Sequence, residues 1–210
     1  MKDALILVDI QKDFLPGGSL EVKDGDQVIP VANVLQQHFE LIVATQDFHP
    51  EDHGSFATQH GGKEPGEYVE LNGLEQILWP AHCVQNTEGA EFADDLQMDM
   101  VQKVFKKGID AGIDSYSGFY DNGHKRSTGL SEYLKEKNVE RVFIVGLAAD
   151  VCVKFTALDA LKEGFKTVVV KDGTRAVNLK AGDYERTMQE LGDKGTIIIE
   201  SSEVSSVLSS

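Results

Sequence analysis

Cysteine is scarce in this 210-residue chain, which contains only Cys83 and Cys152. Two cysteines are too few for the disulfide framework of a small secreted domain, so the sequence favours a reducing compartment. The N-terminal stretch MKDALILVDI lacks the apolar region and the cleavage site of a signal peptide. No apolar run reaches the roughly 18 residues that a membrane-spanning helix needs. We therefore expect a cytoplasmic protein.

Basic residues are also few, because 20 lysines and arginines face 35 aspartates and glutamates, for a formal net charge of −15. This imbalance argues against nucleic acid and anionic membranes as partners, since both bind basic patches. A neutral or cationic small ligand is compatible with the charge, although a solvated acidic surface accounts for it better. The length and the 41% hydrophobic content predict a single domain over residues 1–210.

Short apolar runs alternate with helical patterns along the chain. The runs are rich in β-branched residues and comprise ALILV (4–8), LIVAT (41–45), KVFKK (103–107), RVFIVG (141–146), TVVVK (167–171) and TIIIE (196–200). Several lack polar alternation, as is typical of parallel strands covered on both faces. Helical spacing appears over residues 26–40, 127–138, 150–163 and 181–192. The pattern predicts a three-layer α/β fold whose mainly parallel sheet has about six strands.

Residues 47–99 show no such regular pattern, yet they hold four of the six histidines and the only tryptophan. A long irregular segment in a compact domain is usually functional or disordered. We expect this segment to form a loop region that binds a metal and a substrate.

Polar residues follow the carboxyl ends of the predicted strands, which is where open α/β sheets bind ligands. Asp9 follows the first strand, and Asp47 and His49 follow the second. One lysine of the pair at 106–107 faces inward at the end of the third strand, although strand alternation alone does not say which one. Cys152 lies just beyond the fourth strand. The sequence thus predicts a carboxylate, an amine and a thiol at one edge of the sheet.

A lone cysteine is most often a small buried hydrophobic residue. In GLAADVCVKF (146–155), however, Cys152 lies in the turn between a buried strand and a helix that is expected to begin near Asp150. A helix N-terminus and a nearby lysine both lower the pKa of a thiol. Backbone N–H groups of such a turn can stabilise an oxyanion. With Asp9 and a lysine as neighbours, a catalytic role for Cys152 is favoured.

Asp47 and His49 stand two residues apart on an extended segment, so their side chains point to the same side. A carboxylate and an imidazole suit a divalent transition metal, and His82 in WPAHC (79–83) is a candidate third ligand. Alone, the Asp–His pair is better interpreted as part of a polar loop. His53 is either a further ligand or a residue that supports the ligands. Two histidines and a carboxylate also describe a non-haem iron site, but that alternative leaves Asp9, the inward-facing lysine and Cys152 without a role.

Five successive segments resemble the motifs of nicotinamidases and pyrazinamidases within the isochorismatase-like cysteine hydrolases. They are DIQKDFLPGGSLEV, TQDFHPEDHGSF, WPAHCVQNT, KKGIDAGIDSYSGFYDN and GLAADVCVKFTALDA, and the likeness runs from Leu5 to about Ala176. The resemblance implies a catalytic triad of Asp9, Lys107 and Cys152. It implies the metal ligands Asp47, His49 and His82, whereas His53 matches a position that binds the metal in only some members.

The resemblance also implies a pocket around a pyridine ring, lined by Phe14, Leu20, Trp79 and Tyr116. The Leu147–Ala148 bond matches the family's cis peptide, and the backbone amides of Ala148 and Cys152 match its oxyanion hole. The chain departs from the family at Ala149 and Val151, where a threonine and an aromatic residue are usual.

The implied activity is hydrolysis of nicotinamide to nicotinate and ammonia in NAD salvage, with pyrazinamide as a further substrate. It would proceed through a thioester on Cys152 and use one divalent metal ion, with Zn²⁺ favoured over Fe²⁺ and Mn²⁺. Nicotinamide is the expected partner, and the sequence is compatible with a homo-oligomer. One alternative is a related cysteine hydrolase acting on another small amide. Isochorismate is disfavoured as a substrate, because the chain has both Cys152 and the metal ligands.

Overall fold

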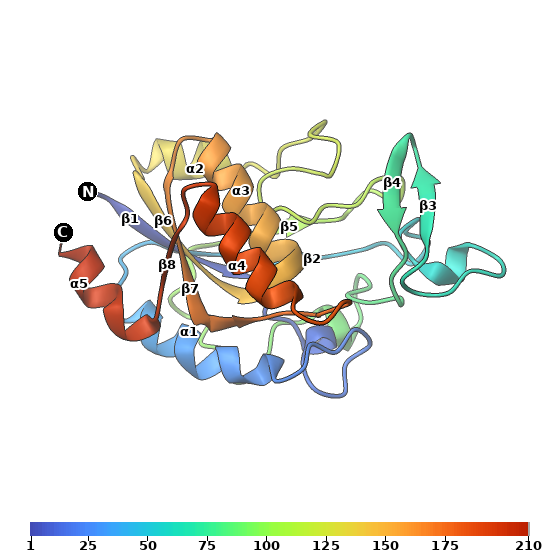
Figure 1. Cartoon of the computed structure of the whole chain (residues 1–210), viewed down its shortest axis with the longest axis horizontal. Helices are drawn as coiled ribbons and strands as arrows, with labels where there is room; N and C mark the ends of the chain where they lie inside the picture. The colour runs from blue at the N-terminus through green and yellow to red at the C-terminus, as the bar shows by residue number, and fades with distance from the viewer. Residues whose placement is uncertain (210) are drawn as a thin grey trace.

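The computed structural model describes residues 1–209, and its centre is a sheet of six parallel strands in the order β5-β2-β1-β6-β7-β8 (Figure 1). The strands are β1 (Asp3–Val8), β2 (Ile42–Asp47), β5 (Lys103–Lys107), β6 (Arg141–Leu147), β7 (Lys166–Arg175) and β8 (Ile197–Ile199). Each coincides with one of the six apolar runs of the sequence. The predicted parallel sheet is therefore confirmed.

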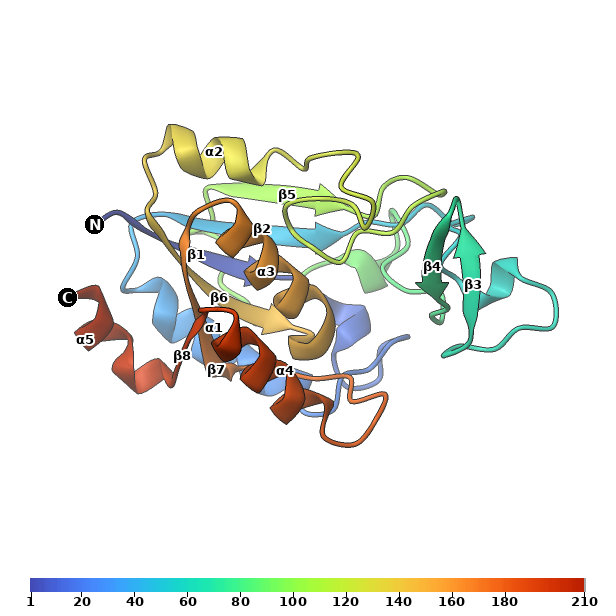
Figure 2. The ribbon, with the colours of Figure 1, turned by 45° about the horizontal axis from the view of Figure 1, so that its top comes forward.

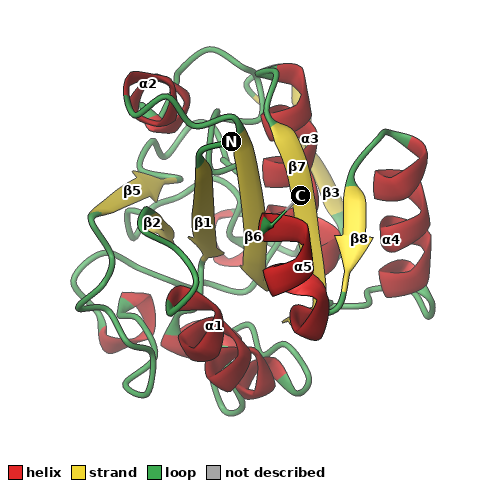
Figure 3. Ribbon diagram, turned by 90° about the vertical axis from the view of Figure 1, so that its left-hand side faces the viewer, coloured by secondary structure: helices red, strands yellow, loops and turns green. Residues whose placement is uncertain are grey.

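Helices cover both faces of this sheet, which confirms the three layers. Helix α1 (Val28–Gln36) lies on one face, and α2 (Leu130–Glu136), α3 (Lys154–Lys162) and α4 (Asp183–Asp193) lie on the other (Figures 2 and 3). A short C-terminal helix, α5 (Val204–Leu208), was not predicted. Its Val204 joins the apolar cluster on the α1 side. Within residues 1–209, no helix is both long and apolar enough to cross a membrane.

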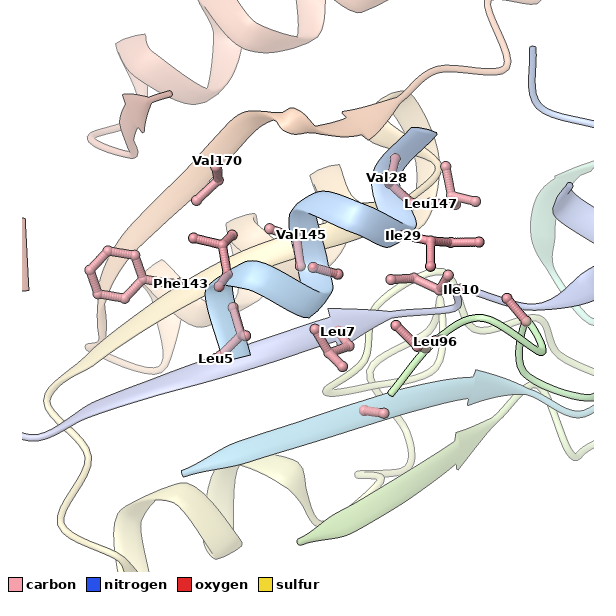
Figure 4. Close-up of a cluster of buried hydrophobic side chains, with 14 of the residues drawn as sticks. Leu5, Leu7, Ile10, Val28, Ile29, Leu96, Phe143, Val145, Leu147 and Val170 are labelled. Carbon is pink, nitrogen blue, oxygen red and sulfur yellow. The ribbon is translucent and has the colours of Figure 1, made fainter. Parts of the chain in front are cut away.

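Strand β1 shows why the apolar runs lack alternation. Leu5 and Leu7 pack toward α1, where Figure 4 shows them with side chains of α1 and β6, whereas Ile6 and Val8 pack on the opposite face. All four side chains are completely buried. Burying an aliphatic side chain of this size contributes roughly 1.5–3 kcal/mol. Both faces of the strand therefore stabilise the fold.

The segment 47–99 is less irregular than expected, because it contains an antiparallel hairpin of β3 (Tyr68–Leu71) and β4 (Leu74–Ile77). The hairpin projects at the end of the molecule opposite the chain termini (Figure 1). Its turn residues Asn72 and Gly73 both have positive φ, at 50° and 84°. An Asn-Gly pair favours this tight two-residue turn. The prediction of an irregular segment is wrong at this point.

Candidate active site

The strand register brings the predicted polar residues together. Asp47 pairs with Lys107 across β2 and β5, and Val8, which precedes Asp9, pairs with both Thr45 and Gly146. Parallel strands that are in register end at the same edge of the sheet. Asp9, Asp47, Lys107 and the turn after β6 consequently meet at one place.

Lys107 lies at the centre of this group and is 2% exposed. Its Nζ is 2.8 Å from Asp9 Oδ2 and 2.5 Å from Asp47 Oδ1, and it lies 3.4 Å from Cys152 Sγ. It also donates a hydrogen bond of 2.8 Å to the carbonyl of Ser115. Burial alone would lower the pKa of Lys107, but the two carboxylates outweigh it and raise that pKa well above its usual value. The lysine is therefore held in its charged form.

Lys106, the other lysine of the pair, is exposed, and its ammonium lies 3.6 Å from the centre of the Phe48 ring. The structure thus resolves which of the two lysines faces inward.

Cys152 is 6% exposed and lies in a π-helical turn, Ala149–Val153, between β6 and α3. The peptide bond between Leu147 and Ala148 is cis, as the resemblance implied. The expected lowering of the thiol pKa is not found. Burial raises the pKa of Cys152 well above its usual value, and Lys107 opposes this effect only in part, since Asp9 and Asp47 also raise it. The thiol of the free protein is therefore mostly protonated, and its proton must pass to an acceptor when the sulfur attacks a substrate.

Asp9 is the base within reach. It is completely buried, and Thr45 Oγ1 donates a hydrogen bond of 2.6 Å to its Oδ1. Burial raises the pKa of Asp9, against the opposing effect of Lys107. A raised pKa makes a carboxylate a better proton acceptor. Asp9 and Cys152 can thus exchange one proton beside a permanent ammonium group.

Asp47, His49 and His82 form a second cluster, with one potential ligand atom from each residue within 4.8 Å of the others. His49 Nδ1 lies 2.9 Å from the Gly108 carbonyl, and His82 Nδ1 lies 2.8 Å from the Pro80 carbonyl. A carbonyl only accepts hydrogen bonds, so Nδ1 carries the proton in each ring and Nε2 is left for a ligand. The two Nε2 atoms are 3.6 and 3.9 Å from Asp47 Oδ2. These donors fit a divalent transition metal.

Two further observations concern the metal ligands. Burial, together with the neighbouring His49, lowers the pKa of His82 to about 4, so this ring is neutral at physiological pH. Gly108 has a φ of +64°, and a Cβ at this position would overlap Cε1 of His49. Only glycine allows the chain to pass this closely beneath the imidazole.

His53 is presented differently from the other two histidines. The backbone N–H of Ser55 donates to His53 Nδ1 at 3.2 Å, and Ser55 Oγ lies 2.7 Å from the same atom. Burial and the neighbouring His49 lower the pKa of His53, so the ring is neutral and carries its proton on Nε2. A hydrogen bond to the backbone of Ile113 acts in the opposite direction and raises the pKa of His53, but burial outweighs it. His53 therefore offers an N–H group, rather than a lone pair, beside the ligands.

A pocket opens at the thiol and contains all four side chains that were expected to line it. Its walls are formed by Phe14, Leu20, Asp47, Trp79, His82, Asp114, Tyr116, Ala148, Val151, Cys152 and Val177. Both clusters therefore face the same small space.

Asp114 is a site residue that the sequence did not single out. It is buried, accepts a hydrogen bond of 2.7 Å from the Ser115 N–H and another of 3.1 Å from Gln76 Nε2, and lies close to His49 and His53. Gln76 also donates to the hydroxyl of Tyr116 at 2.9 Å. Asp114 thus fixes one wall of the pocket.

Known proteins resemble this chain over almost its full length. The isochorismatase domain matches residues 3–203. The nicotinamidase of Escherichia coli is 45% identical over 199 residues, which is 93% of each chain. The solved nicotinamidase/pyrazinamidase of Acinetobacter baumanii is 46% identical with a TM-score of 0.93, and the alignment covers 97% of this chain and 98% of that one.

A third relative was solved with a metal. The pyrazinamidase of Pyrococcus horikoshii in complex with zinc is 40% identical, with a TM-score of 0.78 over 95% of this chain and 99% of that one. Zinc is the kind of ion that the cluster of Asp47, His49 and His82 fits. Together with the matching domain and the identities above, this likeness shows that the chain belongs to the isochorismatase-like hydrolases and, within them, to the nicotinamidase/pyrazinamidase family.

Proposed function

We propose that the chain hydrolyses nicotinamide to nicotinate and ammonia with Cys152 as the nucleophile. The observation that carries this proposal is the contact of Lys107 with both Asp9 and Cys152 at the wall of the pocket. Relatives with 45% identity are nicotinamidases, which supports the choice of substrate. Pyrazinamide, another carboxamide on a nitrogen heterocycle, fits the same proposal.

The proposed reaction begins when Asp9 accepts the thiol proton and the sulfur attacks the carboxamide carbon. The backbone N–H groups of Ala148 and Cys152 stabilise the resulting oxyanion, and removing one such donor typically costs about 2.7–4 kcal/mol. Asp9 then returns the proton to the nitrogen, the C–N bond breaks, and ammonia leaves. A water molecule cleaves the thioester, giving nicotinate and restoring the thiol. Lys107 stays charged throughout and stabilises the anionic sulfur.

Asp47, His49 and His82 would hold the metal, and we propose Zn²⁺ by analogy with the Pyrococcus horikoshii enzyme. When bound, the ion supplies a Lewis acid that can hold the pyridine nitrogen and so orient the ring. Phe14, Leu20, Trp79 and Tyr116 would enclose that ring. Both cysteines are free and buried, which suits a reducing compartment, and we propose a cytoplasmic enzyme whose catalytic unit spans residues 1–210.

Ammonia release from nicotinamide, pyrazinamide and benzamide tests this function. We expect turnover of the first two and poor turnover of benzamide, which lacks the ring nitrogen. Cys152→Ala should abolish release, and the matched variant Cys83→Ala should retain most of it. Equal activity of the two variants would show that Cys152 is not the nucleophile, and equal turnover of benzamide would remove the proposed role of the metal.

A further inference from the structure

The side chain of Asp13 has no role in the proposed chemistry, yet it joins two loops that build the site. Asp13 Oδ1 accepts a hydrogen bond of 3.2 Å from the N–H of Ser19, next to the pocket residue Leu20. Asp13 Oδ2 accepts one of 2.7 Å from the N–H of Cys83, next to the predicted metal ligand His82. One carboxylate thus connects a wall of the pocket with the metal site.

The surroundings of Asp13 leave it little freedom to move. The side chain is buried, and a Cβ on Gly89 would overlap Asp13 Oδ2. The Asp13 carbonyl also accepts a hydrogen bond of 3.0 Å from the N–H of Leu20. Phe14, the next residue, lines the pocket, and its ring centre lies 5.6 Å from that of His82.

The loop that contains His82 and Cys83 depends on its hydrogen bond to Asp13. Cys83 has a φ of 46°, in the left-handed region that a non-glycine residue adopts at some energetic expense. The hydrogen bond from its N–H to Asp13 holds that conformation and, through the chain, the backbone of His82. Both partners of the carboxylate are backbone donors, so an ionised carboxylate satisfies both of them.

We propose that Asp13 is a positioning residue that couples the pocket to the metal site, by fixing Leu20 and Phe14 relative to His82. This inference rests on the proposed function, because it takes His82 as a metal ligand and the pocket as the place of the pyridine ring. It predicts that a change at Asp13 weakens the binding of both metal and ring, although Asp13 touches neither in the proposed arrangement.

Asp13→Asn is the variant of choice, because it keeps the shape but replaces one acceptor oxygen with a donor group. Asp121→Asn is the matched control. Asp121 is also a buried carboxylate, and it accepts hydrogen bonds from the backbone N–H groups of Gly123, Lys125 and Arg126, which belong to its own loop. Both variants should lower the melting temperature, so a difference between them in binding separates positioning from general stability.

The measurements are the Zn²⁺ dissociation constant by chelator competition, nicotinate binding to the Zn²⁺-loaded protein by calorimetry, and steady-state ammonia release. We expect Asp13→Asn to weaken Zn²⁺ binding about 10–100-fold, the usual effect of losing a group that orients a ligand. At saturating Zn²⁺, kcat should recover while KM for nicotinamide stays raised, because the Leu20 wall remains displaced. Asp121→Asn should change neither constant.

Gly89→Ala provides an independent test should Asp13→Asn fail to fold, because the added methyl group would displace the carboxylate without removing it. It should weaken Zn²⁺ binding in the same direction. The proposal would be overturned if Asp13→Asn and Gly89→Ala, where they fold, bound Zn²⁺ and nicotinate as tightly as the control Asp121→Asn does. A wild-type protein that binds no Zn²⁺ would instead disprove the proposed metal, and one that releases no ammonia from nicotinamide would disprove the proposed function.

Discussion

Lys107 and Asp47 lie opposite each other at the ends of adjacent strands, with Nζ 2.5 Å from Oδ1, and this pair joins the two halves of the site. Oδ1 of Asp47 faces the ammonium beside Cys152, while Oδ2 faces the two histidines of the predicted metal site. Burial would raise the pKa of Asp47, but Lys107 and His49 outweigh it and hold that pKa below its usual range. The Asp47 carboxylate is thus ionised, so it can pair with Lys107 and also contribute a ligand oxygen to the predicted metal site.

Replacing Lys107 with methionine should destabilise the protein strongly, because Asp9 and Asp47 would stay buried without their counter-charge. Removing one partner from a buried ion pair costs about 3–5 kcal/mol. We expect a loss of this size at pH 7, measured by urea denaturation with a chelator present. Lys106→Met, at the exposed neighbour, is the control and should change the free energy of unfolding by no more than about 1 kcal/mol, the size of the exposed cation–π contact with Phe48 that it removes.

The loss in the free energy of unfolding that Lys107→Met causes, called the deficit below, should depend on pH in a defined direction. The lowered pKa of Asp47 means that its stabilising contribution is present above about pH 4, the unfolded value, and is lost as the pH falls through the folded value. The raised pKa of Lys107 means that its contribution is present below about pH 10 and is lost only as the pH rises through the folded value. The deficit of Lys107→Met should therefore shrink below pH 4. A deficit that stays constant from pH 7 to pH 3 would contradict this expectation.

His53 should not be required as a metal ligand, because its Nδ1 accepts from Ser55 and its Nε2 carries the proton. We expect His53→Gln, which retains an N–H donor, to weaken Zn²⁺ binding by no more than about 100-fold, as is typical of groups outside the ligand set. The matched variant His49→Gln should weaken it far more. Chelator competition measures both constants, and equal losses would make His53 a fourth ligand.

Asp150 should hold the segment after β7 in place where that segment forms part of the pocket wall. Its two carboxylate oxygens accept hydrogen bonds of 2.9 Å from the N–H groups of Val177 and Asn178, and Val177 lines the pocket. Asp150→Ala releases this segment without touching Asp9 or Lys107. We expect KM for nicotinamide to rise about tenfold with a smaller change in kcat, because binding is affected more than chemistry. A fall in kcat alone would place the effect on the Cys152 turn.

The sheet was predictable because short apolar runs without alternation, separated by helical patterns, are typical of a parallel sheet buried on both faces. The convergence of Asp9, Asp47 and Cys152 then followed from the geometry of parallel strands. The choice of Lys107 over Lys106 did not follow, since alternation distinguishes two faces but not which face is inside. The family resemblance supplied that choice, and the burial of Lys107 agrees with it.

Other features depend on contacts between distant residues and had weaker signals. The β3–β4 hairpin was signalled by Asn72-Gly73, but its strands, such as LEQI, carry too few β-branched residues to suggest a strand. Asp114 occurs in a turn-rich segment, and only the fold shows that Gln76 reaches it from the hairpin. The raised pKa of Cys152 is not predictable from the sequence, because the sequence shows a neighbouring lysine but not the depth of burial.

Asp9 has two separable tasks in the proposed reaction, and Asp9→Asn distinguishes them. Asp9 has a φ of 47°, a conformation that asparagine also tolerates, so the variant should keep the backbone. Without a proton carrier, ammonia cannot leave readily, and we expect amide turnover to fall by roughly 10²–10⁴. Alkylation of Cys152 by iodoacetamide should respond differently. The variant loses the base that takes up the thiol proton, but it also loses a negative charge that raises the thiol pKa, and Lys107 still lowers that pKa. Because these effects oppose each other, the variant should be alkylated at a rate within about tenfold of wild type at pH 7.

Both rates should be measured on one preparation from pH 6 to pH 10, with Cys152→Ala as the control for labelling at Cys83. Slow hydrolysis, with alkylation within about tenfold of wild type, is the expected outcome, because Lys107 still stabilises the thiolate while proton delivery to the leaving nitrogen is lost. If alkylation fell in parallel with hydrolysis, Asp9 would be needed to form the thiolate itself. If hydrolysis persisted near the wild-type rate, another group would carry the proton, and Asp9 would serve only to pair with Lys107.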